Sequence, residues 1–340
     1  MTNDTVATGR IESLYVYVKI EGLLIFFFNG LIVLAITTQA ALRKRKEYVI
    51  IGMQASADAL QGTALFGAGL YRNLLIYAGT QNRLVSTRTC LFTFHNLVWL
   101  VSDPLSALMM TVVSVDRLIA VSIPIKYRTL ERDYAFGLAG GAYGFCLLNA
   151  LVGATLTVLQ SHTPQHAAIC FTTWALVPRF YDWFKLVTVG GASVSVGLYA
   201  AVLAVYTNRC KPRAVDAEST GQQNKNAKKE AEKRFQRKLT ISLGWSTVCT
   251  LLLTVIPSLT LIGLSRALKE GIVTPEVYGK FLMPLYMMAQ LNPVVNLVIY
   301  LKRLVPIRKG IKNTLTCGGQ LPLNLELMTS QVKTVRHVDR

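Results

Sequence analysis

Charged side chains within long apolar stretches are the residues of this sequence best suited to chemistry. Asp58, Asp103 and the adjacent pair Asp116 and Arg117 all lie in such stretches. An ionised group in the apolar core of a membrane costs on the order of 3 kcal/mol or more, so such groups commonly serve binding, ion coordination or switching. Asp58 stands midway along its stretch without a local partner. Asp116 and Arg117 stand near the end of theirs, where opposite charges can pair.

The sequence gives little evidence for a metal site or an enzyme active site. Among the four histidines, His162 and His166 are four residues apart but have Pro164 between them, which argues against a shared helix face. No cysteine or acid nearby completes a zinc ligand set. An intramembrane hydrolase would need clustered histidines or a Ser–His pair within the apolar stretches, and His95 is the only histidine in one. We therefore expect no enzyme.

The composition indicates a membrane protein. Of the 340 residues, 52% are hydrophobic and 16% charged, with a mean hydropathy of +0.39, whereas a soluble domain carries about 25% charged residues. The net charge of +18 is concentrated in four blocks that alternate with apolar runs. A nucleic-acid binder would instead spread such charge over one face, so no nucleic-acid partner is expected.

The elements that must position the charged residues are helices that cross a lipid bilayer. About 20 apolar residues span the ~30 Å hydrocarbon core as a helix, and the absence of two-residue alternation argues against a β-barrel. We predict an all-α membrane protein with a seven-transmembrane helix bundle. Its spans are expected at residues 15–38, 49–71, 91–121, 134–157, 183–206, 239–264 and 277–300.

The fourth predicted span is the least hydrophobic and is rich in glycine. Its small residues recur four apart, in the pairs Gly137–Gly141 and Gly140–Gly144. Small residues at this spacing let the backbones of membrane helices approach closely. We therefore expect this helix to pack tightly on its neighbours through these glycines.

Basic residues predict the orientation of the chain. They gather in residues 43–46, 126–132, 207–238 and 302–312, whereas the alternate connections are poor in them. Loops rich in Lys and Arg stay on the cytoplasmic side. The expected protein is therefore a multi-pass protein of the plasma membrane, with its N-terminus extracellular and its C-terminus cytoplasmic.

The predicted domains follow from this orientation. Residues 1–14 form the extracellular N-terminus, and Asn3 begins an acceptor sequence for N-glycosylation. Residues 15–300 form the seven-transmembrane domain, whose third cytoplasmic loop covers about 207–238. Lys19 and Glu21 are expected to reach the outer interface, because they stand near the outer end of the first span.

A cytoplasmic tail of residues 301–340 completes the chain. Its first part alternates basic residues with aliphatic ones, which predicts a short amphipathic helix on the anionic inner leaflet. Cys317, just beyond, is a candidate for palmitoylation or an unmodified thiol. The sixth span is expected to extend into the cytosol, because the residues before it favour a helix.

Several landmarks, taken in order, resemble the rhodopsin-like (class A) G-protein-coupled receptors. They run through all of the predicted spans except the fourth and fifth and through the second outer loop. They are Asn29, Ala57-Asp58, Cys90, Asp116-Arg117-Leu118, Pro124, Tyr127, Cys170, Pro257, Asn292, Asn296 and Tyr300. The sequence around Asp116-Arg117-Leu118 is similar to nematode serpentine chemoreceptors of the SX class.

Some positions depart from the family pattern. Leu297 replaces a proline expected before Tyr300, and Pro293 stands one turn earlier, so the kink of the seventh helix should shift outward. Arg237 occupies the position where many members hold an acid that restrains the arginine of the third helix. Cys90 is about two residues further from Arg117 than is usual.

The resemblance implies a coupling switch made of Asp116, Arg117 and Tyr300, with Arg117 released on activation to contact a heterotrimeric G protein. It also implies a Na⁺ site, since hard cations prefer oxygen ligands. The expected ligands are Asp58, Ser106, Asn292 and Asn296, with Ser102 nearby. A water-filled network around a protonated Asp58 is the alternative. No other cofactor is expected.

The resemblance further implies a disulfide between Cys90 and Cys170, both on the oxidising side, and a ligand pocket in the outer half. The expected pocket residues are His95, Trp99, Ser102, Asp103, Ser258, Ile262, Tyr286 and Gln290. Ordinary packing is the alternative for His95 and Trp99. Asp103 either binds a cationic ligand or is protonated and donates a hydrogen bond.

The implied function is a receptor for an unknown small molecule or peptide, such as a chemosensory cue or a neuromodulator. Trp99 stands where monoamine receptors carry their acid, and Gln290 stands where opsins carry the retinal lysine, which disfavours both kinds of receptor. The alternative function is a seven-span transporter or channel. No repeated pair of broken helices supports it.

Overall fold

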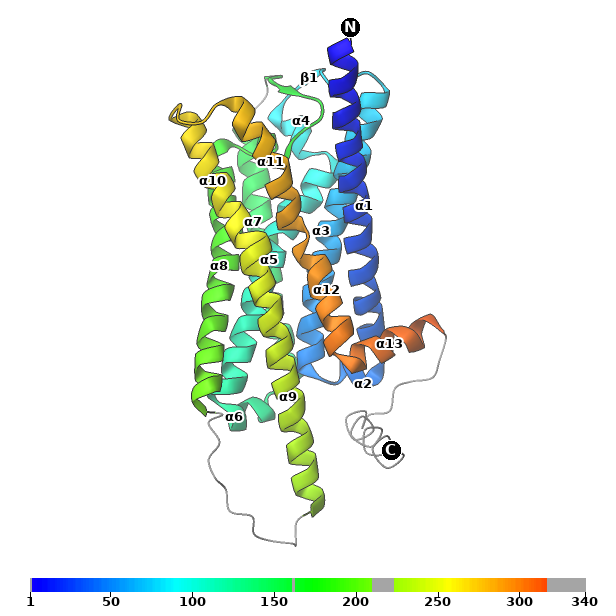
Figure 1. Ribbon diagram of the computed structural model, residues 1–340, viewed down its shortest axis with the longest axis vertical. Helices are drawn as coiled ribbons and strands as arrows, with labels where there is room; N and C mark the ends of the chain where they lie inside the picture. Colours follow the sequence, from blue (N-terminus) through cyan, green and yellow to red (C-terminus); the bar gives the residue numbers. More distant parts are fainter. Residues whose placement is uncertain (1, 161–162, 210–222, 317–340) are drawn as a thin grey trace.

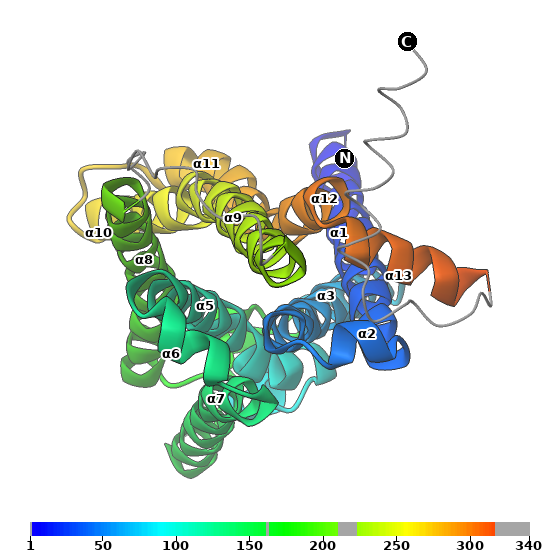
Figure 2. The ribbon, with the colours of Figure 1, turned by 90° about the horizontal axis from the view of Figure 1, so that it is seen from below.

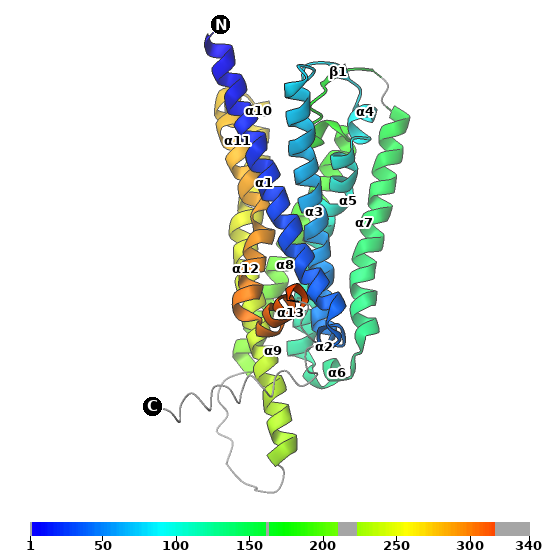
Figure 3. The same ribbon diagram turned by 90° about the vertical axis from the view of Figure 1, so that its right-hand side faces the viewer.

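The computed structural model describes residues 2–160, 163–209 and 223–316, with side chains described for residues 14–160, 163–208 and 234–316 (Figure 1). Long helices run side by side along the bundle (Figures 1 and 3). They are α1 (Thr2–Thr38), α3 (Lys46–Tyr77), α5 (Phe94–Ser122), α7 (Arg132–Gln160), α8 (Pro178–Arg209), α9 (Gln223–Thr250) continued by α10 (Ile256–Lys269), and α11 (Pro275–Gln290) continued by α12 (Asn292–Arg303).

Shorter elements close the two ends of the bundle. At the lower end in Figure 1, here named the α6 end, lie α2 (Ala40–Arg43), α6 (Pro124–Thr129) and α13 (Val305–Leu315). At the opposite end lie β1 (Leu84–Val85), α4 (Thr87–Leu91), β2 (His166–Ala167) and the 3₁₀ turn η1 (Thr172–Trp174). The strands β1 and β2 pair antiparallel. We name this opposite end the disulfide end, after the bond described below.

Each of the predicted runs is a helix, and α5 is central among them. Viewed along the bundle, α5 lies between α3, α7 and α8, while α1 and α12 close the ring on the far side (Figure 2). Within the described residues, six helical segments are long and apolar enough to cross a membrane. The helix outside this set is α3, which buries polar side chains including Gln54, Asp58 and Gln61. A helix that faces the interior of a bundle can carry such groups when they are hydrogen-bonded.

Two of the long helices are interrupted near a proline. A π-helical turn, Leu251–Val255, separates α9 from α10 and ends two residues before Pro257. A break at Leu291 separates α11 from α12, two residues before Pro293. Prolines and π-turns interrupt the i→i−4 ladder and bend helices. The break in the seventh helix therefore lies at Pro293, where the sequence predicted the kink.

Helices α1 and α3 make a close contact through glycines. A Cβ added at Gly62 would lie 2.5 Å from the Phe26 amide nitrogen, and one at Gly22 would lie 2.4 Å from that of Phe66. The backbones themselves touch here. The prediction for the fourth helix is wrong in this respect, because a Cβ at Gly137, Gly140, Gly141 or Gly144 in α7 would meet nothing within 4 Å. Spacing alone does not reveal which face of α7 is packed.

This contrast gives a paired test of helix packing. Gly62→Val should sharply reduce the folded fraction, because the new side chain meets backbone atoms that cannot move without separating α1 from α3. Gly141→Val makes the same chemical change in open space and should leave the folded fraction near that of the wild type. The measurement is the fluorescence-detected elution profile and thermal midpoint of both variants in detergent. Equal losses in the two variants would contradict the packing described.

The remaining boundaries refine the predicted domains. The first helix begins at Thr2, so it includes most of the segment that was predicted as the extracellular N-terminus. The Asn3 side chain is not among those described. α9 begins at Gln223 and projects beyond the α6 end, as the sequence predicted for the sixth helix (Figure 1). α13 turns away from α12 and points outward from the bundle, beside the ends of α1 and α2 (Figures 2 and 3). Cys317 lies outside the described residues.

Candidate functional site

The disulfide end is built around the bond between Cys90 and Cys170, which confirms the predicted pairing. Cys90 lies in the short helix α4, and the new helix α5 begins at Phe94. The break between α4 and α5 accommodates the longer spacing between Cys90 and Arg117. The side-chain amide of Asn96 donates to the Cys90 carbonyl at 2.8 Å, which fixes α4 against the start of α5.

A small cavity lies beneath the loop that carries Cys170, between α1, α3, α5 and α11. Its empty space is about 270 Å³, open solvent included. Its lining contains three of the predicted pocket residues. The lining residues are Val18, Ala64, Leu65, Ala68, Arg72, His95, Trp99, Thr172 and Tyr286.

The other predicted pocket residues lie elsewhere. Ser258 and Ile262 are outside this lining, and the Ile262 side chain is exposed. Gln290 is buried and accepts a 2.5 Å hydrogen bond from the Gln61 amide. Ser102 is buried, and its hydroxyl has no partner among the described residues. The cavity therefore lies closer to α1 and α3 than the sequence predicted.

Asp103 has a partner within the protein. Its Oδ2 lies 3.3 Å from Lys185 Nζ and accepts from the Thr188 hydroxyl at 3.4 Å, both on α8. The Lys185 ammonium also stands over the Trp99 ring, 5.0 Å from its centroid. From the sequence, Asp103 was expected either to bind a cationic ligand or to be protonated. The structure shows a third arrangement, an ion pair with Lys185. Asp103 and Lys185 together join α5 to α8 at the level of the cavity.

Asp58 and Ser106 meet in the middle of the bundle, as predicted. Asp58 Oδ1 accepts from the Ser106 hydroxyl at 2.5 Å and from the Gln54 amide at 3.0 Å. The oxygens of Asn292 and Asn296 do not turn toward Asp58. They accept from α9, where Thr250 donates to Asn292 at 3.2 Å and Ser246 donates to Asn296. The structure thus brings together two of the four predicted ion ligands and uses the other two to join α9 to α12.

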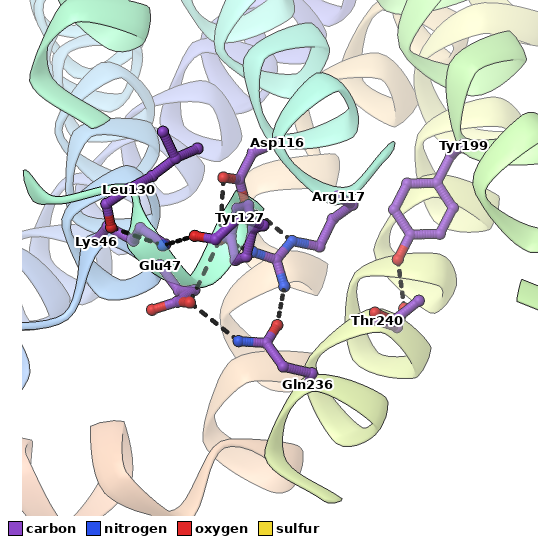
Figure 4. A network of polar contacts seen from close by, with 9 residues as sticks. All are labelled: Lys46, Glu47, Asp116, Arg117, Tyr127, Leu130, Tyr199, Gln236 and Thr240. Atoms are coloured by element: carbon purple, nitrogen blue, oxygen red, sulfur yellow. Dashed lines mark hydrogen bonds and ion pairs between the residues drawn. The ribbon is translucent and has the colours of Figure 1, made fainter. Parts of the chain in front are cut away.

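At the α6 end, Arg117 lies at the centre of a polar network (Figure 4). Its side chain is 1% exposed, and its Nε donates to Asp116 Oδ2 at 2.9 Å, with a second contact from Nη2. Nη2 also donates to the Tyr127 hydroxyl at 2.7 Å, and Nη1 donates to Gln236 Oε1 at 2.9 Å. Arg117 therefore connects its own helix to α6 and α9.

Glu47 extends this network to α3. The Gln236 amide donates to Glu47 Oε1 at 3.0 Å, and the Tyr127 hydroxyl lies 3.3 Å from the same oxygen (Figure 4). Lys46 Nζ donates to the Leu130 carbonyl at 2.8 Å and contacts the Tyr127 carbonyl. Burial raises the pKa of the Tyr127 phenol, so it remains a neutral donor between the two acids. We name Glu47, Asp116, Arg117, Tyr127 and Gln236 the α6-end network.

Two expected members of this site lie apart from the network. Tyr300 is buried in an apolar cluster with Tyr48, Tyr199 and Leu239, and within the described residues no hydrogen bond joins it to Arg117. Arg237 is exposed, so it does not face Arg117. The neighbouring Gln236 faces it instead, because one helical step of 100° turns the next side chain away.

The sequence reasoning missed Glu47, Gln236, Lys185 and Arg72. Arg72 was omitted because the predicted second span ended at residue 71, yet Arg72 belongs to α3 and is buried. The cost of a charge in an apolar span, applied to Lys185 and Arg72, would have singled out both. The same reasoning also misplaced Glu21, which is buried in α1 rather than at an interface, with one carboxylate oxygen unpartnered among the described residues.

Comparison with known proteins supports one assignment of the chain. Residues 28–300 match the family model described as 7 transmembrane receptor (rhodopsin family). The match covers most of the chain, from the last part of α1 to α12. A comparison with curated proteins returned no match.

Proposed function

Because the chain belongs to the rhodopsin family of seven-transmembrane receptors, we propose that it binds a small extracellular ligand and activates a heterotrimeric G protein. The observation that carries the proposal is the α6-end network, in which a buried arginine connects α3, α5, α6 and α9. A buried charge is costly unless it is fully paired, so such charges commonly serve a function. Here that function would be a contact between helices that can form in one packing and break in another.

The proposed topology follows from the charge distribution. The disulfide end faces the outside and the α6 end, with its basic segments, faces the cytoplasm of the plasma membrane. α3 also spans the membrane, as the second span in chain order, which brings the number of spans to seven. α13 lies on the inner leaflet. A buried face of polar groups on α3 and the basic residues Lys302, Arg303 and Lys312 near α13 support these two assignments.

In the proposed mechanism, ligand binding favours a second packing of the same helices. The π-turn and Pro257 give α9 and α10 a point at which one can move relative to the other. Movement of α9 away from α5 would separate Gln236 from Arg117, leaving the guanidinium accessible to a G protein. A ligand shifts this equilibrium only by its difference in affinity for the two packings.

The decisive experiment measures nucleotide exchange. The receptor is reconstituted in lipid nanodiscs with heterotrimers of several Gα classes, and a ligand library is screened in parallel. Ligand-promoted exchange on any Gα supports the receptor proposal. Substrate flux or ionic current in receptor-containing vesicles without G protein, together with no exchange on any Gα, would favour the alternative of a transporter or channel.

A sodium ion near Asp58 is part of the proposal. Asp58 supplies a carboxylate and Ser106 a hydroxyl at one point, and the buried, unpartnered Ser102 hydroxyl on the same helix supports a further oxygen ligand. The oxygens of Asn292 and Asn296 accept hydrogen bonds from α9, so these two residues are not part of the proposed ion site. The ion, when bound, would supply a positive charge that holds the Asp58 carboxylate ionised.

This part of the proposal predicts a specific salt effect. NaCl should raise the thermal midpoint of the purified protein by several degrees relative to N-methyl-D-glucamine chloride at equal concentration, because a ligand that binds the folded state stabilises it. Asp58→Asn should remove the difference between the two salts. Equal midpoints in both salts for the wild type would favour the water network around a protonated Asp58.

A further inference from the structure

Arg72 is a buried cation that the proposed switch and ion site do not use. It lies on α3 near the disulfide end, its side chain is 7% exposed, and it lines the small cavity. No carboxylate lies within ion-pair distance of it among the described residues. The nearby acid Asp103 is already paired with Lys185. A buried charge without a counter-ion is costly, which makes Arg72 a candidate for an ionic function.

The protein holds the guanidinium without neutralising it. Arg72 Nε donates to the Ile169 carbonyl at 3.1 Å, and Nη2 donates to the Cys170 carbonyl at 3.4 Å. The guanidinium carbon, Cζ, lies 5.0 Å from the Phe171 ring centroid and 5.6 Å from that of Tyr15. These contacts orient the side chain but supply no negative charge. Nη1 makes no hydrogen bond within the described part of the chain, and a guanidinium has five donors in a fixed fork.

Apart from Arg72, the lining is mainly apolar or aromatic, with polar groups on His95, Thr172 and Tyr286. Val18, Ala64, Leu65 and Ala68 give the lining its aliphatic part. Trp99 adds an aromatic ring, whose centroid lies 4.5 Å from that of Phe184. A site of this kind suits a ligand with one charged end and a short apolar body. The Lys185 ammonium above Trp99 is matched by Asp103, so the unbalanced charge in the cavity is that of Arg72.

We infer that this cavity binds a small organic carboxylate, with its carboxylate group on Arg72 and its apolar body between Leu65, Trp99 and Tyr286. The planar guanidinium fork matches a carboxylate in two parallel hydrogen bonds. The inference deepens the proposed function, since it names the chemical class of the ligand.

The experiment uses matched pairs of probes that differ only in charge. Hexanoate and phenylacetate are compared with hexanamide and phenylacetamide on the purified, full-length protein at constant ionic strength. The two carboxylates should raise the thermal midpoint in a saturable way, and the two amides should not. Arg72→Met should weaken the apparent affinity for the carboxylates about tenfold or more, since a charge-assisted pair is lost.

Two further variants separate binding from folding. Arg266→Met removes an exposed arginine from α10 and should leave carboxylate binding unchanged. Ala68→Leu fills the cavity while Arg72 stays in place, so it should abolish the response even if Arg72→Met fails to fold. The inference is overturned if amides stabilise the protein as well as carboxylates, if neither carboxylate acts on the wild type, or if Ala68→Leu responds like the wild type.

Nucleotide exchange keeps this inference distinct from the proposed function. Exchange promoted by a neutral ligand, without carboxylate binding, would leave the receptor proposal standing and remove the carboxylate site. Saturable carboxylate binding that depends on Arg72, with no exchange on any Gα, would support the site and count against the receptor proposal.

Discussion

Asp103→Asn is expected to destabilise the protein by about 3 kcal/mol, because it leaves the Lys185 ammonium without its counter-ion between α5 and α8. The estimate is at the low end for a buried pair, since the Lys185 side chain is 30% exposed and that of Asp103 is 8% exposed. Lys185→Gln should cost a similar amount. The measurement is the thermal midpoint of each variant in detergent, together with its surface expression.

A double variant distinguishes the pair from the residues taken singly. Asp103→Leu combined with Lys185→Met removes both charges, so it should recover most of the stability lost by either single change. Lys280→Met is the control, because its pair with Glu276 has both side chains largely exposed, at 69% and 79%. That change should cost no more than about 1 kcal/mol. Strictly additive losses in the double variant would show that Asp103 and Lys185 do not interact.

Much of the fold could be predicted from the sequence because a membrane imposes it. Every predicted span is a helix, since backbone groups in lipid must pair within their own segment. The breaks at Pro257 and Pro293 could also be predicted, because proline cannot continue the hydrogen-bond ladder. Which glycines make the close contacts between helices could not be predicted. Gly62 touches backbone and Gly141 touches nothing, although both are small residues within long helices.

The sites were predictable to the extent that their contacts are local. Asp116 and Arg117 are adjacent in sequence, so their pairing required no tertiary knowledge. Lys185 and Asp103 are 82 residues apart, and their pairing depends on how α5 meets α8. The partner of Arg117 on α9 depends on helix rotation, and an error of one residue exchanges Gln236 for the exposed Arg237.

That rotation leads to a prediction in which two variants of one network act in opposite directions. Gln236→Leu should raise ligand-independent nucleotide exchange, because it removes the amide that joins Arg117 to Glu47 while keeping a side chain of similar size. A hydrogen bond to a charged group contributes about 1.5–3 kcal/mol. Its loss from the resting packing alone would shift the equilibrium roughly 10- to 150-fold toward the active one.

Arg117→Ala should instead lower both basal and ligand-promoted exchange to the level of receptor-free membranes, because the proposed contact to the G protein is gone. Arg237→Ala is the matched control for Gln236→Leu, since it alters the adjacent exposed side chain and should leave basal exchange unchanged. All three variants are compared at equal surface expression. If Gln236→Leu and Arg237→Ala both behaved as wild type, the bridge from Arg117 to Glu47 would not restrain the resting packing. The hydrogen bonds of Arg117 to Tyr127 and Asp116 would then have to hold it alone.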